Sequence, residues 1–179
     1  MRKDVETIAL REQDYFTIKS GIAINPNAGM FWREGIRPSG SLPYLTPPDI
    51  HNNEIIEPNT NIRRLLNDDG IKHAHNKIIP PFSIVCIRSG HHCGKVAFAT
   101  VSCTISSALF AIIVNDKNKL LPRYVFHMMN SQRNHIHLLG KGERIQHLFI
   151  SEFKAISIPL LSIERQTEII EKASLNIFN

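Results

Sequence analysis

The chain has 179 residues, of which 42% are hydrophobic and 21% are charged, and it contains 9 Gly and 10 Pro. This length fits one domain with a substantial core, and this composition excludes a disordered or collagen-like chain. The longest apolar run, Ala108 to Val114, is far too short to cross a bilayer. No apolar segment follows the basic start Met1-Arg2-Lys3, so we expect no signal peptide.

The charge balance is mildly basic. There are 21 Lys and Arg against 16 Asp and Glu, a net charge of +5 with a sequence pI near 9.3. Such an excess permits a polyanionic partner but does not require one. The three cysteines are odd in number and lack CxxC spacing, which indicates reduced thiols in a cytoplasmic protein rather than a disulfide framework.

The first half of the chain is expected to be extended and rich in turns. The segment from Tyr15 to Ile18 predicts a strand that ends at Ser20-Gly21. Six Gly and Pro residues between positions 26 and 43 exclude a long helix there. Positions 51–76 are polar and basic, and we expect them to form an irregular loop.

Three apolar, β-branched runs follow in the middle of the chain, at 82–87, 95–101 and 108–114. They predict three strands joined by short polar turns, which favours an antiparallel or mixed sheet. A helix is then expected to open at Leu121-Pro122, because Pro is tolerated in a first turn. Its apolar face consists of Tyr124, Val125, Met128 and Met129.

The end of the chain predicts a strand at 155–160 and a last helix with Ser162 as its N-cap. In this helix Ile163, Ile170 and Ile177 lie seven residues apart, with Gln166 and Ala173 between them. This heptad pattern favours the start of a coiled-coil-like dimerisation or spacer helix, and it equally fits an amphipathic helix packed on its own domain. The predicted class is therefore α+β with a mixed or antiparallel sheet in residues 1–160 and the helix in 161–179.

The sequence contains no complete motif for nucleotide binding, metal binding or catalysis. The turn Ser89–Lys95 is too short for a phosphate-binding loop and is followed by Val96 instead of a hydroxyl residue. Its adjacent His and Cys side chains do not have the spacing of zinc ligands. The pairs His73/His75 and His135/His137 could place both imidazoles on one strand face, but such pairs are more often solvated or hydrogen-bonded. We expect no metal site, and no catalytic constellation is recognisable.

One ordered set of short segments stands out: Ile18–Gly21, Gly40–Leu45, Ile84–Ala97, Ile156–Leu161 and Glu164–Ile170. The set resembles the target-recognition domain of a type I restriction–modification specificity (S) subunit. In that family an SG turn precedes a GxxPYL strand, an SGxxxGK turn, a tyrosine-bearing helix, and an "IPLP" segment before an "EQ" helix. The resemblance runs from Tyr15 to Glu171.

The chain departs from that family pattern at Cys93, where a branched aliphatic is usual, at Leu161, where Pro is usual, and at Arg165, where Glu is frequent. The larger departure is length, because a complete subunit of the family has two recognition domains separated by long helices. This chain has one domain and the beginning of one helix.

The resemblance implies sequence-specific binding of double-stranded DNA without catalysis. Each recognition domain of such a subunit reads one half of a bipartite site. The subunit brings modification (methyltransferase) subunits, which methylate adenine, and restriction subunits to that site. It also implies that this chain binds no cofactor, and that S-adenosylmethionine, Mg²⁺ and ATP belong to the partner subunits.

Reading DNA requires cationic groups on phosphates and polar side chains at base edges. Loops supply the candidates, each of which is otherwise a solvated surface group: Arg37, Ser39, Tyr44, Thr46, His51, Asn52, Asn53, Arg63, Arg64, Lys72, His73, Arg88, Ser89, His91, His92, Lys141, Arg144 and Gln146. We favour the 88–92 turn and the 140–144 loop, because glycine lets the backbone approach a phosphate. Lys95 either contacts DNA or stabilises its turn.

Four other functions stay open at this point. One is a homodimeric half-subunit joined through the 163–177 heptad positions. Another is the specificity domain of a single-chain methyltransferase–nuclease. A small-molecule enzyme would need a polar pocket with a perturbed carboxylate or histidine. A protein-interaction module would bind the modification subunit but no duplex.

Overall fold

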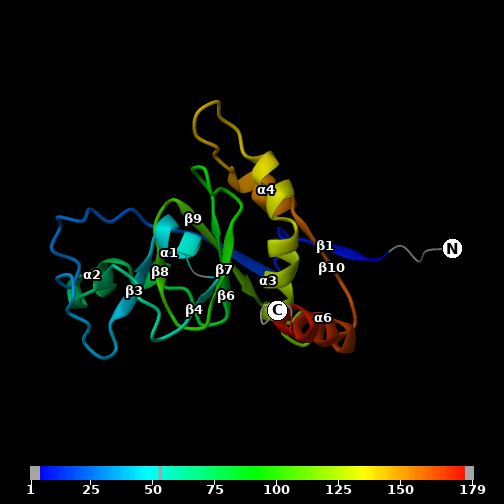
Figure 1. Cartoon of the computed structure of the whole chain (residues 1–179), viewed down its shortest axis with the longest axis horizontal. Helices are drawn as coiled ribbons and strands as arrows, with labels where there is room; N and C mark the ends of the chain where they lie inside the picture. The colour runs from blue at the N-terminus through cyan, green and yellow to red at the C-terminus, as the bar shows by residue number, and fades with distance from the viewer. Residues whose placement is uncertain (1–4, 53, 176–179) are drawn as a thin grey trace.

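A computed structural model describes residues 5–52 and 54–175, and its fold is α+β (Figure 1). The strands are β1 (Thr7–Ala9), β2 (Phe16–Ser20), β3 (Leu42–Leu45), β4 (Ile55–Ile56), β5 (Leu65–Leu66), β6 (Ser83–Ile87), β7 (Val96–Ala99), β8 (Thr104–Ile105), β9 (Leu109–Val114) and β10 (Ser157–Pro159). The helices are α1 (Pro47–Asn52), α2 (Asp68–His73), α3 (Pro122–Ser131), α4 (Arg133–Leu139), α5 (Ile150–Ala155) and α6 (Ile163–Leu175), with a 3₁₀ turn at His75–Lys77.

The central sheet has the strand order β2-β9-β6-β7-β4. Its β2–β9, β9–β6 and β6–β7 pairs are antiparallel, whereas β4 and β7 are parallel. The three strands predicted in the middle of the chain are confirmed as β6, β7 and β9, and the early strand is confirmed as β2. A smaller sheet, β5-β3-β8, lies beside the central one, and β1 pairs with β10.

Alternate side chains of the central strands enter two different cores. Ile84 and Cys86 of β6 belong to one hydrophobic cluster, while Val85 and Ile87 belong to another on the opposite face. This arrangement follows from the two-residue period of a strand. It explains why the run at 82–87 is continuously apolar rather than alternating.

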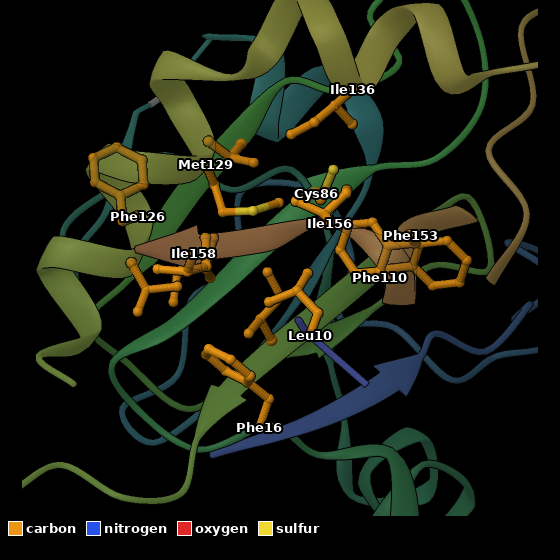
Figure 2. Packing of buried hydrophobic residues seen from close by; sticks show 14 of the residues in the cluster. Leu10, Phe16, Cys86, Phe110, Phe126, Met129, Ile136, Phe153, Ile156 and Ile158 are labelled. Atoms are coloured by element: carbon orange, nitrogen blue, oxygen red, sulfur yellow. The ribbon is translucent and has the colours of Figure 1, made fainter. Parts of the chain in front are cut away.

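The larger core lies between the central sheet and helices α3, α4 and α5 (Figure 2). Its aromatic centre is Phe110 stacked on Phe153, with ring centroids 4.8 Å apart. The predicted apolar face of α3 is confirmed, since Tyr124, Val125 and Met129 are buried and Met128 is partly buried against them.

One local prediction is wrong. The 51–76 segment is not an irregular loop, because it contains β4, β5 and α2. Asn67 caps α2 by accepting a hydrogen bond from the Gly70 amide (2.9 Å), and two Asp residues in the first turn favour the helix dipole. His135 and His137 both lie in α4, so the strand geometry that would give this pair a shared face does not occur.

A buried amide side chain in helix α6 bonds to the chain just before α3. The Gln166 side chain is fully buried, accepts from the Leu121 amide (2.8 Å) and donates to the carbonyls of Lys119 (2.7 Å) and Leu161 (2.8 Å). The prediction that Gln166 faces a partner helix is therefore wrong. The Ser162 N-cap is confirmed by its hydrogen bond from the Arg165 amide.

The other positions of the predicted partner helix have different surroundings. Ile163, Ile170 and Ala173 are partly buried, and Ile170 packs against the core of its own domain. Ile177 lies outside the described residues. Helix α6 is therefore an amphipathic helix packed on its own domain, the second of the two alternatives. Among the described residues, none of the helices combines the length and the hydropathy needed to span a membrane.

We expect Gln166→Ala to lower the free energy of unfolding by about 2–4 kcal/mol, because it leaves one amide and two carbonyls without their partner. Chemical denaturation measures the loss. The control is Glu171→Ala on the exposed side of the same helix, which should change stability by less than about 0.5 kcal/mol. Equal stability of the two variants would contradict the role given to Gln166.

Candidate nucleic-acid interface

The turn that connects β6 to β7 is built around a glycine that cannot be replaced. Gly94 has φ of 88°, and a Cβ at this position would lie 2.9 Å from the Arg133 carbonyl oxygen of α4. The Gly94 amide donates to the Ile87 carbonyl (2.8 Å), which closes the turn. His91 and His92 are exposed at its tip, whereas Cys93 is buried beneath it.

The loop between α4 and α5 is closed by two backbone hydrogen bonds. The Lys141 amide donates to the His147 carbonyl (3.0 Å), and the His147 amide donates back to Lys141 (2.8 Å). Inside it Gly142 has φ of 129°, and a Cβ there would lie 2.2 Å from the Ile145 carbonyl oxygen. The 141–147 loop therefore projects as a tight unit that exposes Arg144 and 62% of Ile145 (Figure 1).

The β6–β7 turn and the 141–147 loop lie side by side. The Gly90 amide donates to the Gln146 carbonyl (2.9 Å), and the Leu148 amide donates to the Arg88 carbonyl (2.7 Å). Ser89 forms an isolated β-bridge with His147. Two segments that sequence analysis favoured separately therefore form one surface.

Arg88 connects these two segments through its side chain. Its guanidinium lies 4.6 Å from the centroid of the Phe110 ring, and its Nη2 donates to Nε2 of His147 (2.6 Å). The Nε atom is buried and has no hydrogen-bond partner in the described part of the chain. Arg88 thus holds the 141–147 loop in place; its predicted contact with DNA stays a prediction.

His147 is a residue of this surface that sequence reasoning missed. It accepts from Arg88 and packs edge-on against Phe149, with ring centroids 5.1 Å apart. No motif of the family resemblance includes it, and 59 residues separate it from Arg88. Only the tertiary contact with Arg88 identifies His147 as part of this surface.

Helix α1 adds a third segment. The His51 ring stacks on His92, with centroids 3.7 Å apart and an interplanar angle of 23°, and Lys95 Nζ donates to the His51 carbonyl. Desolvation lowers the pKa of His51, and electrostatic repulsion from the neighbouring His92, Lys95 and Arg133 side chains lowers it further. Lys95 therefore ties the turn to α1, which is the structural one of the two roles considered for it.

A second group of predicted residues lies around the smaller sheet and α2 (Figure 1). Arg37 donates to Asn61 and to the Ile62 carbonyl (2.8 Å), and Arg63 pairs with Glu34 at 3.7 Å. The remaining members of this group are Arg64, over the Phe31 ring at 5.8 Å, Lys72, paired with Asp69 at 3.7 Å, and the exposed Ser39 and His73. The structure does not bring this group together with the β6–β7 turn.

Two predicted base contacts have other roles. Tyr44 is only 2% exposed, its hydroxyl donates to the Ile22 carbonyl (2.8 Å), and burial raises its pKa. The expectation of a surface tyrosine is wrong, because β3 directs this ring into the core of the smaller sheet. The Thr46 hydroxyl donates to the Asp49 carboxylate (2.6 Å) at the start of α1. Asn52 ends α1, and Asn53 lies outside the described residues.

The thiols do not have the properties of nucleophiles. Burial raises the pKa of Cys103 to about 12, and it raises those of Cys86 and Cys93 as well. A thiol that stays protonated is inert. In residues 5–52 and 54–175 there is also no group of three or more His, Cys, Asp or Glu that could hold a metal ion.

Comparison with protein families decides the classification. Residues 9–174 match the model of the type I restriction modification DNA specificity domain. The chain belongs to this specificity-domain family. The family resemblance read from the SG, PYL and IPL segments is thereby confirmed.

Individual relatives of this specificity domain are distant in sequence. The specificity subunit of the type I restriction enzyme EcoR124I/EcoR124II from Escherichia coli is 23% identical over 146 residues, which cover 79% of this chain and 33% of that protein. This chain therefore spans about a third of the length of the curated relative that it matches.

Solved structures share the fold. The type I S subunit from M. genitalium has a TM-score of 0.63 at 19% identity, covering 98% of this chain and 40% of that one. The HsdS subunit from Thermoanaerobacter tengcongensis has a TM-score of 0.64 at 15% identity, and the match covers 98% of this chain and 38% of that one. The type IIG restriction endonuclease BpuSI has a TM-score of 0.71 at 10% identity, and the match covers 93% of this chain and 26% of that one.

The 141–147 loop is also held by an ion pair whose strength can be measured. Lys141 Nζ lies 2.9 Å from Glu152 Oε1, and hydrogen bonds from Ser151 and Lys141 lower the pKa of Glu152 from 4.5 to about 2. Because the folded-state pKa is depressed, the pair stabilises the loop fully above pH 4.5 and is lost as the pH falls toward 2.

We expect Lys141→Ala to raise the pKa of Glu152, as measured by following its carboxyl carbon in an NMR pH titration. The control is Lys154→Ala on α5, an exposed lysine without an ion pair in the described part of the chain, which should leave this pKa unchanged. An unaltered titration in Lys141→Ala would show that the pair does not form in solution.

Proposed function

We propose that this chain is the DNA-reading domain of a type I restriction–modification specificity subunit, binding double-stranded DNA at one half of a bipartite site. The observation that carries the proposal is the joined surface of the β6–β7 turn, the 141–147 loop and His51 in a chain of the DNA specificity family. Strand and helix ends support this surface, so the backbone of the segments that carry its polar groups is held in place.

Different groups on this surface suit different parts of a duplex. Arg144 has no ion pair or hydrogen bond with any residue in the described ranges, so its guanidinium is available for a phosphate or a guanine edge. Lys141 is paired with Glu152 and suits a phosphate contact at the loop base. His91, exposed at the turn, offers a ring nitrogen to a base edge.

In this proposal the chain performs no chemistry. Modification subunits would bind S-adenosylmethionine and methylate adenine, and restriction subunits would use Mg²⁺ and ATP, all in the cytoplasm. The family match and the Escherichia coli specificity subunit among the relatives support this division of roles.

A second candidate is a recognition domain within a single-chain restriction enzyme. The likeness to BpuSI, with a TM-score of 0.71, supports it, although the identity is only 10%. Both candidates give the chain the same task of reading DNA. They differ in whether the methyltransferase lies on another polypeptide.

The test begins with the target. Methylated adenines are mapped in cells with and without this gene, and the motif that is lost defines the duplex. We expect this duplex to bind with a log–log salt slope of several units between about 50 and 300 mM salt, because bound phosphates release counterions. An affinity that does not change with salt would contradict the proposal.

A single substitution tests the surface itself. Arg144→Ala should weaken binding of the same duplex by roughly 1–3 kcal/mol, the cost of a lost arginine contact to DNA. Arg165→Ala is the matched control, because this exposed arginine lies on α6 and pairs with Glu168. Equal affinities of the two variants in fluorescence anisotropy would remove the 141–147 loop from the interface.

A further inference from the structure

An apolar groove lies at the opposite end of the β6–β7 hairpin from its turn. It has a volume of about 520 Å³. The residues that line it are Phe82, Phe98, Thr100, Lys117, Leu121, Pro122, Arg123 and Ile170. Phe82 precedes β6 at the groove and Arg88 follows it at the turn, so the length of one buried strand separates the two surfaces.

Phe82 has an unusual conformation for its position. Its φ is 65°, which is sterically costly for a bulky residue, and the residue is 51% exposed. The amide donates to the Ala99 carbonyl (2.7 Å), and the ring lies 6.2 Å from that of Phe98. A strained, half-exposed aromatic residue is a feature of binding sites.

The opposite wall of the groove is rigid. It consists of the start of α3 and Ile170 of α6, and the three hydrogen bonds of Gln166 hold α6 against the chain just before α3. Figure 1 shows this part of α6 beside the beginning of α3, away from the loop between α4 and α5. The groove is therefore formed before any partner arrives.

The charges in the groove define what it can hold. Lys117 and Arg123 lie among its lining residues, and no carboxylate does. Neither cation forms an ion pair within the described ranges. A second copy of this groove placed face to face would bring like charges together, which is unfavourable. An occupant with an apolar face and acidic flanks is complementary in both shape and charge.

We propose that this groove binds an amphipathic, acidic-flanked helix of the methyltransferase subunit. The apolar side chains of this partner helix would pack on Phe82 and Ile170, and its carboxylates would pair with Lys117 and Arg123. This assignment depends on the proposed function, since it names the surface by which a DNA-reading domain holds its enzyme. The DNA surface and the groove lie at opposite ends of β6, so both can be occupied together.

The experiment measures binding of the full chain to the purified methyltransferase subunit encoded with it, by calorimetry. Phe82→Gly removes the ring and also relieves the positive φ, so the fold is retained. We expect this variant, and the double variant Lys117→Glu/Arg123→Glu, each to bind at least about tenfold more weakly. The controls are Leu138→Ser, at an apolar side chain 79% exposed on α4, and Lys154→Glu on α5. Both should bind within about twofold of the unaltered chain.

Each alternative has its own outcome. Unchanged affinity of the groove variants would overturn the assignment. So would a dimer in sedimentation that Phe82→Gly dissociates, since a second copy would then occupy the groove.

Binding of the target duplex is measured on the same samples and separates this inference from the proposed function. A chain that binds the duplex but not the methyltransferase subunit overturns only the groove assignment. A chain that binds neither overturns the proposed function itself.

Discussion

The rest of the structure depends on the burial of strand β6 between two partners and two cores. All five of its residues are buried, β7 and β9 pair with its two edges, and its side chains alternate between two hydrophobic clusters. A shift of one residue would exchange the two faces, so the register is strongly determined. The position of β6 therefore fixes the positions of the β6–β7 turn at one end and the apolar groove at the other.

The recognition surface obtains its rigidity from internal contacts of its own polar residues. Arg88 and Lys141 are cations that the sequence predicts to contact DNA, and Lys95 was considered for the same role, yet each also makes a contact within the protein. Such contacts restrict the loops before DNA arrives, which reduces the entropy lost on binding. Arg144, which has no partner within the described ranges, is presented by this framework rather than belonging to it.

Much of the fold was predictable because its signals are local. The β-branched runs give β6, β7 and β9, and Pro122 with the apolar spacing behind it gives α3. The predictions failed where a position depends on a distant neighbour. Tyr44 is a residue type that often contacts DNA, but its ring faces the core of the smaller sheet. Gln166 occupies a heptad position, but its side chain forms hydrogen bonds with the chain before α3.

The sequence by itself determined four strands of the central sheet (β2, β6, β7 and β9), the helix that covers it and the family to which the chain belongs, because these follow from short periodic patterns and their order. Only the tertiary structure decided which polar side chains share a surface. His147 meets Arg88 across 59 residues and Gln166 meets Lys119 across 47. Nothing in the local pattern specifies such pairs, since they form only when strand pairing and core packing bring distant segments together.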